Sequence, residues 1–291
     1  MYINKWLKEN TTDLKHKLIA ISGSSGDLGK EVCKRLVSLG ADLLLINRNR
    51  EKSERLKEEL LVINKGCNIS IVIIDFENFD SVQKGIEELE KYNIDIFIAN
   101  AASYKIERRI STLGYDNVFQ INFVSHYYII RKIIEKMEKG KIVIVSSIAA
   151  NYSKINLSDI DFSKNRHCNK VYGNSKRFLM YSMYELLKEY KNIDLSVVHP
   201  GISYTNITSH YPKFIFHLIK YPMKLIFCKP KKASLSILKG VFEKCEYHEW
   251  IGPRLFNIWG YPHKRKVSYC SMEESKIIGE YAQEIYNKIK R

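Results

Sequence analysis

The sequence predicts an α/β fold in which one doubly wound parallel sheet is covered by helices on both faces. Apolar segments of strand length alternate with helix-like segments through residues 17–201. The strand-like segments are continuously apolar, which is typical of parallel strands that are buried on both faces. A glycine-rich turn follows the first of them. Strict alternation of strands and helices favours a parallel sheet over other architectures.

The elements follow one another in a regular order. Strands are expected at residues 17–22, 41–47, 69–75, 94–100, 141–147 and 193–201. Helices are expected between them, at 30–40, 51–66, about 79–92, about 114–139 and from near Tyr172 onward. A last strand with a turn is expected within 246–262, and a C-terminal helix over about 273–290. No linker or repeat interrupts this pattern, so we expect a single domain over residues 1–291.

The composition is that of an ordinary globular protein with a strong positive charge. The chain has 291 residues, of which 45% are hydrophobic, and its length allows a sizeable core. A net charge of +15 and a pI near 9.3 would suit nucleic acid, an anionic membrane or phosphorylated ligands. Lysines spread over solvated helix faces would give the same balance. There is no long basic run or arginine-rich arm, so we favour that interpretation and expect no specific nucleic-acid partner.

The cysteines point to a reducing compartment. The six cysteines are scattered and form no C-x-x-C pair, so neither a zinc site nor a disulfide framework is expected. The N-terminal segment is polar and lacks the apolar region of a secretory signal. No stretch has the roughly 18 apolar residues of a spanning helix. We therefore expect a cytoplasmic protein without a metal site.

The glycine-rich turn after the first strand has the features of a phosphate loop. Gly23 would allow the tight turn, Gly26 would let the backbone approach a pyrophosphate, and Gly29 would let the helix pack close to the sheet. The phosphates would then lie at a helix N-terminus, where unpaired N–H groups and the helix dipole favour negative charge. Between the first strand and first helix of an α/β chain, this turn predicts dinucleotide binding.

The end of the second strand favours NADP(H) over NAD(H). Dinucleotide folds that prefer NAD usually carry an acid here, which binds the ribose 2′-hydroxyl. This chain has Asn47 followed by Arg48, with Arg50 two residues further on. A guanidinium can bind a 2′-phosphate bidentately, whereas a carboxylate would repel it. The alternative is that these arginines are ordinary surface charge at the strand end.

Taken in order, the motifs resemble those of the short-chain dehydrogenases/reductases, most of all the retinol-dehydrogenase-like members. The matching segments are 22–29, Asp75 with its neighbours, 98–103, 119–128, 141–149, 171–176 and 197–207. They cover about residues 15–210. The resemblance implies a Rossmann-type fold and an NAD(P)-dependent enzyme that reduces a carbonyl or oxidises an alcohol on a small molecule.

Position distinguishes one tyrosine–lysine pair from three others with the same spacing. Tyr172 and Lys176 lie between the strand ends at Ser147 and Pro200, where α/β proteins place their ligands. We interpret the other three as ordinary helix residues, namely Tyr128/Lys132, Tyr184/Lys188 and Tyr286/Lys290.

The resemblance assigns catalytic roles to four residues. Tyr172 and Lys176 would share a helix face, and the lysine would lower the pKa of the tyrosine, making it a suitable general acid or base. Ser147 matches the serine that holds the substrate oxygen, with Ser146 as the fallback. Asn122 matches an asparagine that supports a proton-relay water, although it could instead be a helix-kink residue.

The cofactor would contact residues at the ends of several strands and in the helix that begins near Tyr172. By resemblance, Asp75 and Phe76 lie near the adenine, Pro200 and Gly201 shape the nicotinamide end, and Thr205 lies near the carboxamide. For Asn100, strand-end structure is about as good an explanation as direct contact. The full set is Gly23, Ser25, Gly26, Leu28, Gly29, Asn47, Arg48, Asp75, Phe76, Asn100, Ala101, Ala102, Tyr172, Lys176, Pro200, Gly201 and Thr205.

Two further segments bear on the substrate. Residues 151–170 lengthen the chain between Ser147 and Tyr172 and predict a loop over the site mouth. Residues 210–232 match the family's substrate lid, and their aromatic and aliphatic side chains predict a substrate with an apolar portion. Interleaved lysines in 213–229 would also suit peripheral membrane contact, but we favour the lid. Residues 233–291 would close the pocket.

One alternative function is a catalytically inactive NADP(H)-binding regulator. The presence of Ser147, Tyr172, Lys176 and Asn122 together argues against it, because a sensor needs no catalytic set. Substrate identity, reaction direction and assembly into a homo-oligomer stay open at this point.

Overall fold

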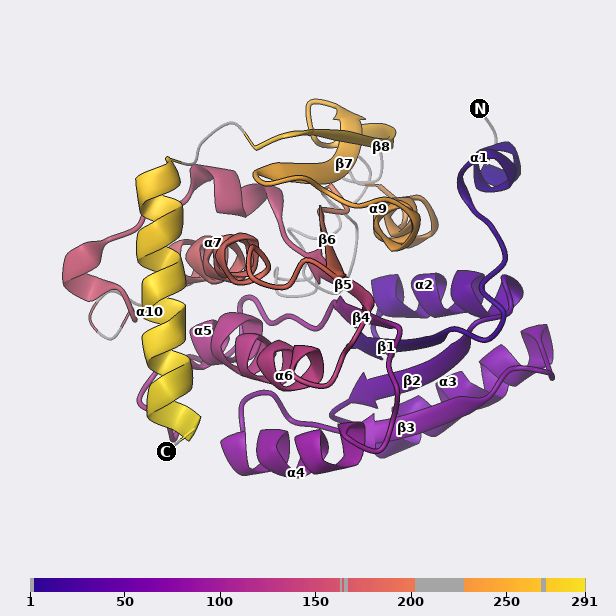
Figure 1. The fold of residues 1–291 in the computed structure, drawn as a ribbon, viewed down its shortest axis with the longest axis horizontal. Coiled ribbons are helices and arrows are strands. Elements are labelled where there is room, and N and C mark those ends of the chain that lie inside the picture. Colours follow the sequence, from indigo (N-terminus) through magenta and orange to yellow (C-terminus); the bar gives the residue numbers. More distant parts are fainter. Residues whose placement is uncertain (1–2, 163, 165–166, 202–227, 268–270, 291) are drawn as a thin grey trace, which may run out of the picture.

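The computed structural model describes residues 3–162, 164, 167–201, 228–267 and 271–290. Its centre is an eight-stranded sheet in the order β3-β2-β1-β4-β5-β6-β7-β8, parallel except for β8 (Figure 1). The strands are β1 (Leu18–Ser22), β2 (Asp42–Asn47), β3 (Ile69–Ile73), β4 (Ile96–Ala99), β5 (Gly140–Val145), β6 (Ile193–Val198), β7 (Glu249–Leu255) and β8 (Trp259–Lys266). The predicted single-domain, Rossmann-type doubly wound sheet is confirmed.

Helices cover both faces of the sheet, and each face buries its own apolar cluster. On one face lie α1 (Ile3–Asn10), α2 (Asp27–Ser38), α3 (Arg50–Ile63) and α9 (Pro230–Phe242). On the other lie α4 (Phe79–Leu89), α5 (Asn117–Phe119), α6 (Ser125–Ile134), α7 (Cys168–Leu186) and α10 (Met272–Lys290). The central strands are continuously apolar because both of their faces are buried in this way.

The order of the strands determines where a ligand can bind. From β1 the chain winds outward through β2 to β3, and from β4 it winds outward in the opposite direction. The reversal lies between β1 and β4, which are parallel neighbours. Their carboxyl ends leave a crevice, because the loops that follow them turn to opposite faces of the sheet.

The long helix expected over about 114–139 is divided into three parts. Asp116 caps its start by accepting hydrogen bonds from the backbone N–H groups of Val118 and Phe119. After α5, residues Gln120–Val124 form a π-helix that leads directly into α6. A π-helix inserts one extra residue into a turn and is found frequently at functional sites.

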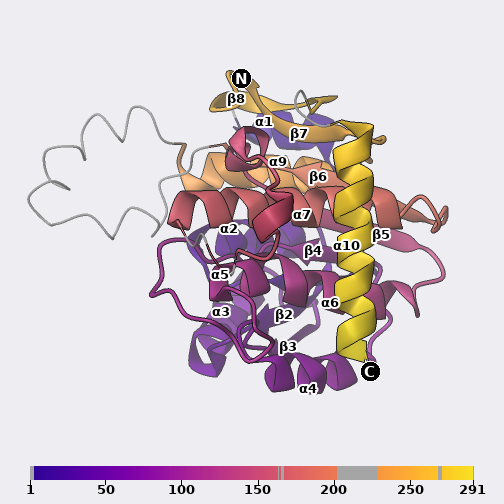
Figure 2. The same ribbon diagram turned by 90° about the vertical axis from the view of Figure 1, so that its left-hand side faces the viewer.

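The C-terminal region differs from the prediction in detail. The single strand expected within 246–262 is an antiparallel hairpin of β7 and β8, which forms one edge of the sheet. Helices α1 and α9 were not expected. The predicted C-terminal helix is present as α10, which packs across α7 and α6 (Figure 2). Among the described helices, none has the length and apolar character needed to span a bilayer.

Candidate active site

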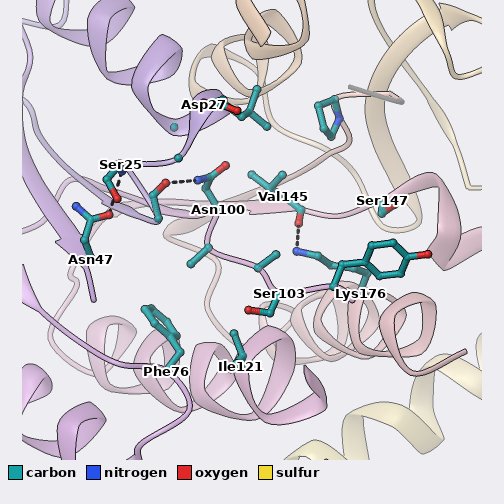
Figure 3. Close-up of a pocket in the computed structure, with 18 of the residues that line it drawn as sticks. Ser25, Asp27, Asn47, Phe76, Asn100, Ser103, Ile121, Val145, Ser147 and Lys176 are labelled. Carbon is teal, nitrogen blue, oxygen red and sulfur yellow. Dashed lines mark hydrogen bonds between the residues drawn. The ribbon is translucent and has the colours of Figure 1, made fainter. Parts of the chain in front are cut away.

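A cavity of about 790 Å³ lies at the carboxyl ends of the central strands. Its lining comes from the segments that follow β1, β2, β3, β4, β5 and β6 and from the first turns of α7. In Figure 3, Ser25, Asn47 and Phe76 lie toward one side of this cavity, and Ser147 and Lys176 lie toward the other. All the predicted cofactor residues that the structure describes line it, as do Ser147, Tyr172 and Lys176.

The glycine-rich turn needs its glycines for different reasons. Gly23 has a φ of +65°, and a Cβ there would lie 2.7 Å from the Cα of Ala101. At Gly29 a Cβ would lie 2.4 Å from the carbonyl oxygen of Gly23, so the helix could not pack this closely. At Gly26 the nearest protein atom would be 3.5 Å away, an ordinary contact. Protein packing therefore does not require glycine at position 26, which leaves the approach of a ligand as its reason.

Hydrogen bonds join this turn to the end of β4. The Ser22 hydroxyl accepts from the backbone N–H groups of Asn100 and Ala101, at 3.0 and 2.9 Å. The Asn100 amide in turn donates to the carbonyls of Ser22 and Gly23, at 2.9 and 3.1 Å. The Asn100 side chain is thus engaged within the protein, which favours the strand-end role over direct cofactor contact through its amide nitrogen.

Asn47 is also engaged within the protein. Its side-chain oxygen accepts from the backbone N–H of Ser25 at 3.0 Å, and its amide donates to the hydroxyls of Ser24 and Ser53. The side chain is buried. Asn47 therefore holds the glycine-rich turn against β2, a role that its position at the strand end did not indicate.

The basic side chains beside this turn differ in whether they pair with a carboxylate and whether they line the cavity. Arg48 is exposed and lines the cavity, and among the described residues no carboxylate pairs with it. Lys52, in the first turn of α3, lines the cavity as well. Arg50 instead lies 3.8 Å from Glu54 and does not line the cavity. Of the two predicted arginines, Arg48 is the one placed to meet a ligand.

His126 is a buried residue that sequence reasoning missed. Burial lowers its pKa to about 3, so the ring is neutral at physiological pH. Nδ1 lies 2.8 Å from the Ile121 carbonyl and must donate to it, so Nε2 accepts from the Ser22 hydroxyl at 3.1 Å. The ring also stacks on Phe76 at 4.4 Å. His126 thus connects the π-helix to Ser22 at the end of β1. The sequence does not indicate this contact, because the two residues are 104 positions apart in the chain.

At the other end of the cavity, Lys176 donates to the Val145 carbonyl at 2.8 Å, and burial lowers its pKa to about 8. Burial raises the pKa of Tyr172, and a hydrogen bond from Ser147 acts in the opposite direction. The expected lowering of the tyrosine pKa by Lys176 is therefore not what this geometry gives, because desolvation is the larger effect. The three other tyrosine–lysine pairs do not line the cavity.

The two serines after β5 have different surroundings. Ser147 accepts from the backbone N–H of Ala149 at 3.2 Å and contacts Tyr172 through a hydrogen bond. The hydroxyl of Ser146 is buried and has no hydrogen-bond partner within the described part of the chain. Ser147 is thus the serine that the fold brings to Tyr172.

Asn122 lies in the π-helix, close to the cavity but fully buried behind it. Its side chain accepts from the backbone N–H of Ser103 at 2.7 Å and donates to the Ser103 carbonyl and the Ser175 hydroxyl. It therefore ties the loop after β4 to α7. Its role in supporting a relay water stays a prediction.

Two further residues complete the substrate end. Tyr104 packs its ring on that of Tyr172 at 4.7 Å, and its hydroxyl bonds to the side chain of Asn169. Both Tyr104 and Asn169 line the cavity. Asn169 is the one described residue of segment 151–170 that does so, since Phe162 of that segment is buried against Phe119. Most of the other described residues of this segment are intermediate or exposed, so its role as a loop over the site mouth stays a prediction.

Arg177, next to Lys176, anchors the catalytic helix. Its guanidinium forms two hydrogen bonds with Glu274 in α10, at 2.9 and 2.6 Å, and donates to the Ala150 carbonyl just after Ser147. Only 2% of the Arg177 side chain is exposed. Arg177 thereby links α10 to α7 and to the segment that follows Ser147.

Part of the predicted site lies outside the described residues. This applies to Thr205, to most of the lid at 210–232 and to nearly all of 213–229. Gly201 is described, with a φ of +78°, and a Cβ there would lie 2.9 Å from Pro253 in β7. The turn at the end of β6 therefore depends on glycine and is supported by the hairpin.

The residues that line the cavity fit a nicotinamide dinucleotide. Arg48 and Phe76 line one end, Gly26 and the N-terminus of α2 line the middle, and Tyr172 and Gly201 line the far end. An extended ligand with a pyrophosphate at its centre would match this series of environments.

Comparisons with known proteins agree with this fold and cavity. A family model for short chain dehydrogenases matches residues 17–214. A short-chain dehydrogenase from Brassica napus, TIC 32 A, is 28% identical over 218 residues, which cover 69% of this chain and 68% of the relative. Retinol dehydrogenase 14 from Mus musculus is 26% identical over 211 residues, 67% of this chain and 63% of the relative.

Solved structures show the same fold. An uncharacterized protein from Mycobacterium paratuberculosis superimposes with a TM-score of 0.77 at 16% identity, covering 96% of both chains. A short-chain dehydrogenase from Sphingobium yanoikuyae in complex with NADPH gives a TM-score of 0.59 at 17% identity, over 77% of this chain and 83% of that one. The chain belongs to the short-chain dehydrogenase/reductase family, with retinol dehydrogenases among its relatives, and is an oxidoreductase acting on CH–OH or C=O groups with NAD(P).

Proposed function

We propose that this protein is an NADP(H)-dependent oxidoreductase that reduces a carbonyl, or oxidises an alcohol, on a substrate with an apolar portion. One observation carries the proposal. One cavity is lined by Arg48 and Lys52, which follow Asn47 on one side, and by Ser147, Tyr172 and Lys176 on the other side. A charged phosphate site and a proton-transfer site are thus separated by a loop suited to a pyrophosphate.

Bound in this cavity, NADPH would provide the hydride for the carbonyl carbon. The Ser147 hydroxyl holds the carbonyl oxygen, and Tyr172 donates the proton that this oxygen needs as it becomes an alcohol. The raised pKa of Tyr172 keeps the phenol protonated at neutral pH, which suits the reduction direction. A charged Lys176 would favour the phenolate that remains, against the larger opposing effect of burial. Oxidation of an alcohol reverses each transfer.

The preference for NADP(H) rests on Arg48. Its guanidinium is exposed at the cavity rim and would bind the 2′-phosphate, with Lys52 as a second cation. Asn47 does not take part directly, because its side chain is committed to Ser24, Ser25 and Ser53. No carboxylate stands at the strand end to select NAD(H).

An apolar substrate portion fits the residues around Tyr172. Tyr104, Ile148 and Ala149 line this part of the cavity and present ring and aliphatic surface. Relatives named as retinol dehydrogenases point the same way, since retinol is an apolar alcohol.

We place this activity in the reducing environment of the cytoplasm. Cys33, Cys67 and Cys245 are buried as free thiols. Burial raises the pKa of Cys245 to about 12, so this thiol stays protonated and unreactive at physiological pH.

The proposal is tested by a substrate screen with the purified chain. Ketones, aldehydes and alcohols of increasing apolar length are offered with NADPH or NADP⁺, and the absorbance of the reduced nicotinamide is followed. We expect turnover that improves with apolar length. Tight NADPH binding without turnover of any class would instead favour the inactive regulator.

A further inference from the structure

We infer that the tip of the β7–β8 hairpin is a docking surface for an anionic lipid bilayer. We call Arg254–Trp259 the hairpin tip. It lies at the edge of the sheet, outside the cavity lining, and forms part of the upper rim of the molecule in Figure 1. The inference concerns where the protein acts and does not depend on its proposed reaction.

Large apolar side chains are exposed at this tip. Phe256 is 80% exposed, Leu255 is 55% exposed and Trp259 is 38% exposed. The rings of Phe256 and Trp259 meet edge to face, with centroids 6.5 Å apart. Single exposed apolar residues need no explanation, but three within five residues form a wedge of the kind that inserts into the bilayer interface.

The backbone conformation at the tip is unfavourable for a phenylalanine at position 256. The N–H of Ile258 donates to the Leu255 carbonyl at 3.0 Å, which closes a turn around Phe256 and Asn257. Both central residues have positive φ, +51° and +59°. Asn and Gly adopt this conformation readily, whereas a bulky residue is strained there. An exposed phenylalanine in a strained position gives nothing to the fold, so a role outside the fold explains it better.

The charge around the tip complements an anionic surface. Arg254 belongs to the tip, and the Arg265 guanidinium reaches it by donating to the Arg254 carbonyl at 2.9 Å, whereas Lys264 and Lys266 lie at the other end of the hairpin, where Lys264 is 3.7 Å from Glu249. Lys232 at the start of α9 adds to them, since its ammonium lies over the Tyr261 ring of β8. Basic residues beside an apolar wedge attract anionic headgroups while the wedge enters the acyl boundary.

The same features disfavour other occupants. A second copy of this chain would bring one molecule of net charge +15 against another. A stable protein interface buries about 1,200–2,000 Å² in total, which a wedge of three side chains does not supply. Binding to a bilayer requires only that a small apolar wedge of the protein enters the interface and that the lipid surface is negatively charged.

The test is co-sedimentation of the full chain with vesicles, either of phosphatidylcholine alone or of phosphatidylcholine with phosphatidylserine. We expect binding only to the anionic vesicles, weakened by added salt. Phe256→Asn should reduce this binding about tenfold, because burial of the ring is lost. It should leave the melting temperature unchanged or raise it, since Asn suits the turn better. Arg254→Gln with Lys232→Gln should weaken binding to anionic vesicles with no change in folding.

Two matched controls and one spectroscopic readout complete the design. Val62→Gln removes an apolar residue that is 82% exposed on α3, and Lys65→Gln removes a charge nearby; neither should alter binding. Trp6 and Trp250 are buried, so quenching of tryptophan fluorescence by brominated lipids should report Trp259. Equal binding by wild type and Phe256→Asn would overturn the inference, as would equal binding to neutral vesicles. A dimer that Phe256→Asn dissociates in sedimentation would identify a second copy as the occupant and overturn it too.

Discussion

Replacing Arg48 by glutamine should remove most of the preference for NADPH over NADH. Arg48 lines the cavity at its rim, with no carboxylate of the described chain paired to it. A hydrogen bond between charged groups contributes about 1.5–3 kcal/mol. Because Arg48 is exposed, solvent screening favours the lower end, which corresponds to a loss of about tenfold in NADPH affinity. NADH lacks the 2′-phosphate and should bind as before.

The assay is fluorescence titration of both reduced cofactors at low and high salt. The matched control is Arg50→Gln, which removes the same charge two residues along, where the guanidinium pairs with Glu54 outside the cavity. In the wild type the preference should shrink as salt rises, since screening weakens the phosphate contact. In Arg48→Gln the salt dependence should be smaller, with Lys52 accounting for what remains.

Three results would refute this reasoning. Equal affinities of the wild type for NADPH and NADH would show that no cation meets the 2′-phosphate. A parallel loss for both cofactors in Arg48→Gln would mean that the residue supports the loop rather than the phosphate. The same loss in Arg50→Gln would show only a general effect of net charge.

Three further changes probe the scaffold and the proton chemistry. Arg177→Met should lower the free energy of unfolding by about 3 kcal/mol in urea denaturation, because Glu274 loses its buried partner; an unchanged midpoint would contradict this. Gly29→Ala should lower the melting temperature, since its Cβ would meet a backbone oxygen at 2.4 Å. Gly26→Ala should keep the fold and weaken NADPH binding. Equal melting temperatures for the two variants would argue against this geometry. Carbonyl reduction should slow as pH rises through about 8, where the pKa of Lys176 places the loss of its proton, and a rate profile flat to pH 10 would count against a charged Lys176.

The sheet and the location of the site could be predicted because both depend on local pattern. Continuously apolar runs identify strands buried on both faces, and glycines with positive φ or close backbone contacts cannot be replaced. The cavity therefore contains Gly23, Ser147, Tyr172 and Lys176 as expected. Their order along the chain carried this information, since Gly23 follows β1 and the other three lie between the ends of β5 and β6.

What could not be predicted depends on contacts between distant segments. His126 and Asn47 hold the glycine-rich turn through hydrogen bonds to residues 104 and 22 or 23 positions away, and no periodic pattern reports such bonds. The balance between burial and charge at Tyr172 likewise depends on packing around the ring. The hairpin of β7 and β8 was missed because the first central position of its turn is Phe256, where an asparagine, aspartate or glycine followed by glycine usually indicates a hairpin.

The most direct test of the proposed chemistry is turnover by Tyr172→Phe on the best substrate from the screen. General acid catalysis contributes roughly 10²–10⁴-fold, so kcat should fall by about that factor while NADPH affinity is unchanged. Tyr128→Phe is the matched control, because Tyr128 has the same spacing to a lysine but lies in α6 outside the cavity. Loss of turnover in Tyr172→Phe alone is the predicted result. Turnover by Tyr172→Phe close to that of the wild type would contradict the assignment of the active site.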